Sequence, residues 1–129
     1  MALSVTLDHL HLRSTDPDAA ARFYVERLGA SPVSRGDAGG ALRVVVDLAG
    51  LRLFIEAVPA GTTQAPPPPF IGLEHLGLAV ADLDAALAAL EAEGVRRLSG
   101  PAQPRPGVRI AFIEGPDATR IELLERSPA

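Results

Sequence analysis

Residues 7–20 read LDHLHLRSTDPDAA, and residues 73–86, which lie 66 positions further along the chain, read LEHLGLAVADLDAA. The same spacing places Glu56 on Glu122. Self-similarity at a fixed spacing indicates two copies of one structural unit, and this repeat decides the architecture in which every other motif is interpreted. The identical pairs in the two stretches are Leu7/Leu73, His9/His75, Leu10/Leu76, Leu12/Leu78, Asp16/Asp82, Asp18/Asp84, Ala19/Ala85 and Ala20/Ala86.

Each copy begins with a predicted strand and a predicted helix. Residues 6–13 and 73–80 place leucines on alternate positions, which is the period of a strand with one apolar face. Asp16 and Asp82 then stand where the N-cap of a helix belongs. The proline-bearing residues 100–107 predict a loop. Further strands are expected at residues 31–35, 42–48 and 51–58 in the first copy and at 95–99, 108–114 and 119–125 in the second.

A proline-rich segment separates the two copies. Residues 63–70 include four consecutive prolines, which cannot join a helix or a central strand and instead form a stiff linker. We therefore expect an α+β fold with a first βαβββ module at residues 1–62 and a second at 71–129. One helix can cover only one face of each sheet, so the other face needs a partner and a homodimer is expected.

The composition limits the classes of function. The chain has 129 residues, of which 47% are hydrophobic, and a formal net charge of −4. This predicts a globular protein, and because the sequence has no basic run, nucleic acid is not an expected partner. No apolar stretch approaches the roughly 18 residues of a membrane span, and the opening residues lack the order of a signal peptide, so a cytoplasmic location with no membrane contact is expected. Because cysteine is absent, any metal must be held by imidazole and carboxylate groups.

Two of the repeated residue types bind metals. His9 and His75 lie opposite the leucines of their strands, and Glu56 and Glu122 lie on the side of the last strand that faces away from its aliphatic residues. Two imidazoles and two carboxylates suit a divalent transition ion such as Zn, Ni, Co, Fe or Mn. Such an ion can polarise a carbonyl and stabilise an enediolate while a carboxylate moves the proton. The alternative is that all four are ordinary solvated side chains that the duplication has retained.

Three stretches also resemble a known family. Residues 8–29 read DHLHLRSTDPDAAARFYVERLG, residues 74–87 read EHLGLAVADLDAAL, and residues 110–125 read IAFIEGPDATRIELLE. Together they resemble the vicinal oxygen chelate superfamily, which contains glyoxalase I, bleomycin-resistance proteins and dioxygenases. The resemblance implies paired βαβββ modules whose curved mixed sheets surround a central cavity.

The resemblance also implies roles for particular residues. Carried over residue by residue, it makes His9, Glu56, His75 and Glu122 the metal ligands, as in bacterial glyoxalase I. It further implies that Glu122 is the base that shuttles the proton, with Glu56 sharing this role. Arg13 matches a basic position that glyoxalase I uses near its substrate.

These observations predict a metal-dependent lyase or isomerase of glyoxalase I type that acts on a small carbonyl or hydroxy-acid substrate, with Arg13, Phe54 and Phe112 in its pocket. The closing turn, residues 115–118, departs from the family pattern, and no glutathione site is recognisable. One alternative is a metal-free protein that binds and sequesters a drug, as bleomycin-resistance proteins do. Another is a metal-dependent transferase like the fosfomycin-resistance proteins, which requires arginines that converge on the metal; the candidates are Arg13, Arg52, Arg109 and Arg120.

Overall fold

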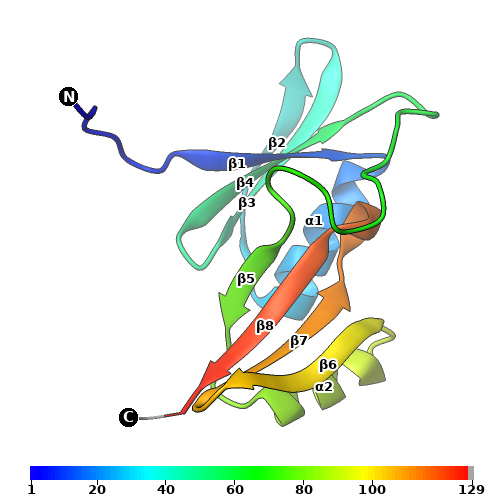
Figure 1. Ribbon diagram of the computed structural model, residues 1–129. Helices are drawn as coiled ribbons and strands as arrows, with labels where there is room; N and C mark the ends of the chain where they lie inside the picture. Colours follow the sequence, from blue (N-terminus) through cyan, green and yellow to red (C-terminus); the bar gives the residue numbers. More distant parts are fainter. Residues whose placement is uncertain (128–129) are drawn as a thin grey trace. The chain divides into compact units, whose positions relative to one another are not determined.

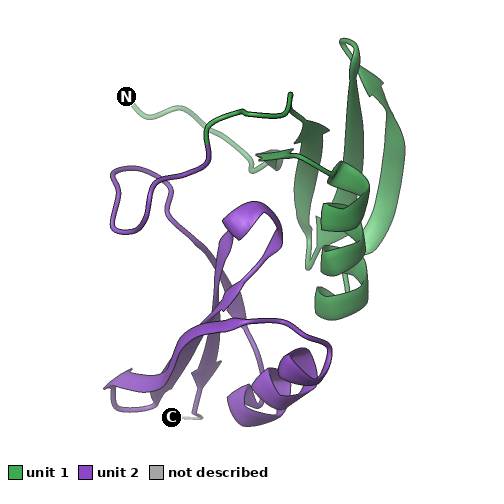
Figure 2. Cartoon of the chain, turned by 90° about the vertical axis from the view of Figure 1, so that its right-hand side faces the viewer, with its two compact units in different colours: residues 1–63 green, residues 64–129 purple. Residues whose placement is uncertain are grey.

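The structure is a computed structural model that describes residues 1–127. The chain divides into two compact units, Met1–Thr63 and Gln64–Ala129 (Figure 2). Each unit contains one α-helix and one four-stranded sheet, which confirms the α+β fold predicted from the repeat. In the part of the chain that the structure describes, no helix is long and apolar enough to cross a membrane.

In the first unit, the first and last strands lie side by side. The sheet has the order β1-β4-β3-β2, and β1 runs parallel to β4 whereas the other neighbours are antiparallel (Figure 1). This arrangement brings together the two strands that carry the predicted histidine and glutamate. The elements are β1 (His9–Ser14), α1 (Pro17–Leu28), β2 (Ser31–Ala38), β3 (Ala41–Leu48) and β4 (Leu51–Ala57).

The second unit repeats this topology. Its sheet has the order β5-β8-β7-β6, with β5 parallel to β8. The elements are β5 (Leu76–Ala79), α2 (Leu83–Ala92), β6 (Arg97–Arg105), β7 (Val108–Glu114), the short 3-10 helix η1 (Pro116–Ala118) and β8 (Arg120–Arg126).

Each helix covers the aliphatic face of its own sheet. In the first unit, Leu53 and Ile55 of β4 lie opposite Val46 and Val44 of β3, and all four are buried together with Tyr24 of α1. Burial of these apolar side chains is the main stabilising contribution that such a unit can have. The second unit has the same kind of core, formed by Leu83, Leu87, Ile113, Ile121 and Leu123.

Aspartate caps hold the start of both helices, as predicted. A side-chain oxygen of Asp16 accepts a hydrogen bond from the backbone N–H of Ala19 at 3.1 Å, and Asp82 accepts one from Ala85 at 3.0 Å. At the other end of α1, Gly29 adopts the left-handed conformation with φ 75°, which a residue with a Cβ adopts only at a cost.

Three expectations about strands need correction, one of which is that the strand expected at residues 73–80 is shorter and spans Leu76–Ala79. Residues 100–107 do not form a simple loop, because β6 continues to Arg105. This is possible since β6 is an edge strand with three register shifts against β7, and prolines are tolerated at edges and bulges. The first strand begins at His9 rather than at residue 6, because β4 begins at Leu51 and nothing in it pairs with earlier residues.

The caps give a stability prediction. Asp82→Ala should lower the free energy of unfolding by about 1 kcal/mol, because the Ala85 N–H loses its acceptor. Asp82→Asn keeps an acceptor and should retain most of the stability. Urea unfolding followed by circular dichroism measures both, and equal loss in the two variants would contradict the role of the cap.

Candidate functional site

The face of the first sheet that points away from α1 carries the candidate site residues of this unit. In the parallel pair of β1 and β4, His11 lies opposite Phe54 and Arg13 lies opposite Glu56. His9 is two residues before His11 and therefore shares its face. The leucines between them point to the helix side, where their partners Leu53 and Ile55 are buried.

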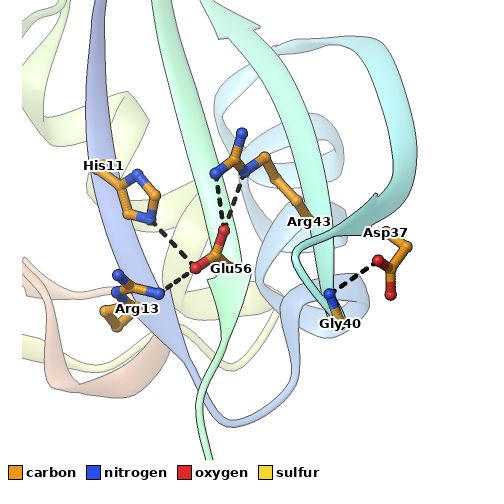
Figure 3. A network of polar contacts seen from close by, with 6 residues as sticks. All are labelled: His11, Arg13, Asp37, Gly40, Arg43 and Glu56. Carbon is orange, nitrogen blue, oxygen red and sulfur yellow. Dashed lines mark hydrogen bonds and ion pairs between the residues drawn. The ribbon is translucent and has the colours of Figure 1, made fainter.

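Glu56 is held between two arginines (Figure 3). Its Oε1 accepts hydrogen bonds from Arg43 Nη2 at 2.8 Å and from Arg43 Nε at 3.1 Å. Its Oε2 accepts a hydrogen bond from Arg13, and His11 Nε2 lies 3.9 Å from the same oxygen. Glu56 is 8% exposed, so its carboxylate has little contact with water. Both of its oxygens accept hydrogen bonds from arginine side chains.

These contacts set the charge of the cluster. The hydrogen bonds from Arg43 lower the pKa of Glu56 and, with the positive charge of Arg13, outweigh the opposing effect of burial. Burial and the neighbouring Arg13 lower the pKa of His11, although Glu56 opposes this shift. At neutral pH the cluster therefore contains two guanidinium ions, one carboxylate and a neutral imidazole, which leaves one positive charge.

His9 does not contact Glu56. Its Nδ1 lies 2.6 Å from Asp8 Oδ2, and its ring stacks on Phe54 with centroids 3.9 Å apart and planes 9° apart. The guanidinium of Arg43 lies 5.3 Å from the Phe54 ring centre on the same face. Phe54 thus contacts His9 through a ring stack and Arg43 through a cation–π contact, beside the Glu56 cluster.

In the second unit, the predicted histidine and glutamate do meet. His75 Nε2 lies 4.0 Å from Glu122 Oε1, and His75 Nδ1 lies 3.2 Å from Glu74 Oε2. Glu74 is in turn paired with Arg120, whose Nε is 2.6 Å from Oε1. Burial raises the pKa of Glu74, but contacts with His75 and Arg120 outweigh it and lower the pKa overall. Phe112 packs edge-on against His75 at 4.9 Å.

The two glutamates differ in their neighbours because the strand registers differ. Glu56 lies opposite Arg13 and Arg43, whereas Glu122 lies opposite Gly77 and Phe112. A Cβ added to Gly77 would lie 3.6 Å from Glu122 Oε1, so a longer side chain there would cover this carboxylate. Within the described residues of the second unit, Glu122 is therefore approached by an imidazole and by no arginine.

The register also decides which histidine is nearest to each glutamate. In the second unit it is the predicted His75, and in the first it is His11 rather than the predicted His9. Across residues 1–127, no group of three or more His, Asp or Glu side chains lies close enough to hold a metal ion. The structure thus brings together the predicted pair His75 and Glu122 and does not bring together His9 and Glu56.

Three partners of the site escaped the sequence analysis. Asp8 and Glu74 precede the two histidines at the same repeat spacing, and this pair of acidic residues was a signal that could have found them. Arg43 had no such signal, because only the antiparallel register of β3 and β4 puts it opposite Glu56.

The four arginines considered for a transferase like the fosfomycin-resistance proteins each pair with a different acidic residue. Arg52 pairs with Asp47, and Arg109 makes two hydrogen bonds of 3.0 Å to Asp84 at the start of α2. Of the four candidates, Arg13 contacts the predicted ligand Glu56, and Arg120 contacts Glu74, which precedes His75 in the sequence. A groove of about 440 Å³ lies between α1 and strands β2 and β3, and its lining contains none of the predicted site residues.

Two repeated α+β units, each with its polar face built on the first and last strands, define a class of small proteins with a paired-module fold. The family model described as Glyoxalase/Bleomycin resistance protein/Dioxygenase superfamily matches residues 6–123. The chain belongs to this superfamily. No curated protein shows significant sequence similarity to it.

Solved structures support this assignment. TnmS3, an antibiotic binding protein from Streptomyces sp. CB03234, is 28% identical, with 98% of this chain and 99% of that chain covered and a TM-score of 0.70. A glyoxylase/bleomycin resistance protein/dioxygenase domain from Frankia sp. EAN1pec is 25% identical over 98% and 100%, with a TM-score of 0.77. The fosfomycin resistance protein FosX from Listeria monocytogenes, complexed with Mn(II) and sulfate, is 15% identical over 97% and 95%, with a TM-score of 0.73, and shows likeness of fold.

The arginine contacts of Glu56 predict a pH dependence of stability. Its folded-state pKa is depressed, so the ionised carboxylate stabilises the fold at neutral pH and this contribution is lost as the pH falls through that pKa. Glu56→Gln should therefore be less stable than the wild type at pH 7, and the difference should shrink towards pH 3. Urea unfolding at several pH values measures this, with Glu114→Gln as the control. A difference that does not change with pH would contradict the assignment.

Proposed function

We propose that the chain is a metal-dependent enzyme that moves a proton on a small oxygenated substrate, in the manner of a lyase or isomerase of glyoxalase I type. The observation that carries this proposal is the pair of His75 and Glu122 in the second unit. One nitrogen and one carboxylate oxygen, 4.0 Å apart, are held on the open face of the sheet. This donor chemistry suits a divalent transition ion.

The surroundings of His75 support the same proposal. A metal-binding histidine usually gives its other ring N–H to a carboxylate, which fixes the tautomer and the ring orientation. Glu74 is placed to accept from Nδ1, and Arg120 holds Glu74 in turn. His75 Nε2 is then the atom that is left for the ion.

The first unit would contribute fewer metal ligands than the sequence predicts. His9 has the chemistry of a ligand, because Asp8 holds its Nδ1 as Glu74 holds that of His75 and Nε2 is the nitrogen that remains. Glu56 does not fit in its described state, since guanidinium groups occupy both oxygens. We therefore assign the ion to His75 and Glu122, and we treat Glu56 as part of the arginine cluster.

The chain's own groups then divide the chemistry. The bound ion would supply Lewis-acid polarisation of a substrate carbonyl. Glu122 would accept the proton from the carbon next to that carbonyl and return it to the neighbouring position. Glu74 and Arg120 would keep His75 in one orientation during this transfer.

Metal content tests the proposal. The purified, untagged chain should bind about one divalent transition ion per site, and His75→Ala and Glu122→Ala should abolish this binding. Glu74→Gln should weaken it by about 10–100-fold, because His75 loses its orienting partner. Elemental analysis after incubation with Ni, Co, Zn and Mn measures the content, and isothermal titration calorimetry measures the affinity.

Two controls make the result specific. Glu114 lies on the same sheet outside the site. The Glu114→Gln variant should therefore bind metal as the wild type does. The Glu56→Gln variant should also retain the metal. Loss of the metal from this variant would show that Glu56 is a ligand. If the wild type binds none of the four metals, the enzyme proposal fails.

Failure of metal binding would favour a second candidate, a protein that binds a small molecule without metal. The similarity to TnmS3 supports this candidate, since that protein is an antibiotic binding protein and 28% identical. His9 and Phe54 supply aromatic side chains on this face of the sheet, and aromatic ligands pack on side chains of this kind.

We further propose that the chain forms a homodimer. Apolar side chains stand exposed just before the first strand of each unit, at Val5 and Leu7 and at the repeat-equivalent Ile71 and Leu73. Exposed apolar clusters of this kind mark interaction surfaces. Size-exclusion chromatography with light scattering should give twice the chain mass, and Leu7→Ser with Leu73→Ser should shift it towards the monomer. A wild-type monomer at micromolar concentration would contradict the dimer.

A further inference from the structure

Gly77 of β5 is a glycine that the backbone of the second unit does not require. A glycine inside a strand weakens the strand, and it commonly marks a bulge, a bend or a place where another molecule approaches closely. β5 pairs with β8 in one continuous register from Leu76 to Ala79, so a bulge does not explain this glycine. The left-handed conformation does not explain it either, since Gly77 lies outside that region, whereas Gly29 lies within it.

The packing around Gly77 does not require a glycine either. Gly77 is exposed, and a Cβ added to it would lie 3.6 Å from Glu122 Oε1, which is an ordinary contact distance. At Gly115, by contrast, an added Cβ would lie 2.8 Å from Ile121 Cδ1 and would force that side chain to move. An alanine would therefore fit at position 77 and would suit a strand better than glycine does. What the glycine provides is an uncovered side of Glu122.

The first unit shows what a side chain at this position does. Gly77 corresponds to His11 by the repeat spacing and to Arg13 by its place opposite the glutamate. His11 Nε2 lies 3.9 Å from Glu56 Oε2, and Arg13 donates a hydrogen bond to the same oxygen. By either correspondence, a side chain at this position reaches the glutamate. The side chain of Glu56 is 10% exposed and that of Glu122 is 19% exposed.

We propose that Gly77 is a specificity-determining residue, because its missing side chain leaves the space beside Glu122 Oε1 in which a small carbonyl or hydroxy-acid substrate lies. Ala79 is two residues further along β5, shares this face and is also exposed, so it extends the same strip without large side chains. A larger side chain at position 77 closes the space. The inference rests on the proposed function, since it assigns the substrate to one side of the carboxylate that is proposed to move the proton.

Carboxyl labelling tests the role of Gly77. The full chain is treated with a chelator and labelled with a water-soluble carbodiimide and glycinamide, and peptide mass spectrometry measures the rate at Glu122. Gly77→Leu should slow this labelling about tenfold, because the carboxylate reacts only in the fraction of molecules in which it is uncovered. Gly77→Ala should slow it less. Both variants should unfold at a urea concentration no lower than the wild type, because the strand loses a glycine.

A second glycine provides a matched control. Gly36 also lies within a strand, and among the described residues a Cβ added to it would meet no atom within 4 Å. Gly36→Leu should therefore leave the labelling of Glu122 at the wild-type rate. Labelling of Glu114, which lies outside the site, should be the same in every variant.

Three results would overturn the proposal. These are labelling of Glu122 at the wild-type rate in a folded Gly77→Leu variant, equal slowing by Gly36→Leu, and a loss of stability in Gly77→Ala. If Gly77→Leu does not fold, the labelling rate of Gly77→Ala decides, and an unchanged rate overturns the proposal. The labelling needs no metal. Failure of the wild type to bind metal therefore contradicts the proposed function, whereas an unprotected Glu122 in Gly77→Leu contradicts the role of Gly77.

Discussion

Each sheet is covered by a single helix on one face, and the arrangement of side chains in both units depends on this constraint. Alternation along β1 and β4 directs the aliphatic side chains to α1, and the same alternation directs His9, His11 and Glu56 to the other face. The second unit obeys the same rule with α2. Each unit therefore has a stable aliphatic layer and, on the opposite side, a polar face that contributes little to the core and is available for chemistry.

The two polar faces differ in their contacts, although each unit keeps an aliphatic layer against its helix. Glu122 meets an imidazole that is held by Glu74 and Arg120, which is an arrangement suited to a metal ion. Glu56 meets two guanidinium groups, which donate hydrogen bonds to both of its oxygens. A duplicated fold has thus placed two different kinds of polar site at equivalent positions.

The chemistry that each unit can support follows from the side chains on its own polar face. Superfamily membership supplies the fold, but the reaction depends on these side chains, because one fold supports many activities.

Much of the fold could be predicted from the sequence, since strand alternation and the aspartate caps are local signals. The continuation of β6 past Gly100 could not, because an edge strand with register shifts tolerates Pro101 and Pro104 in a way that local preferences do not describe. The site was predictable only in part. His9 and Glu56 have the same separation in sequence as His75 and Glu122, yet the parallel registers differ by two residues.

Register follows from how the whole sheet pairs, so counting residues along the chain does not give it.

The unequal roles of the two glutamates are the central claim, and a crystal structure of the metal-loaded chain with an anomalous difference map tests it most directly. We expect an anomalous peak within bonding distance of His75 Nε2 and Glu122, with Glu56 still hydrogen-bonded to Arg13 and Arg43. A peak bonded to Glu56, with both arginines turned away from it, would contradict these roles.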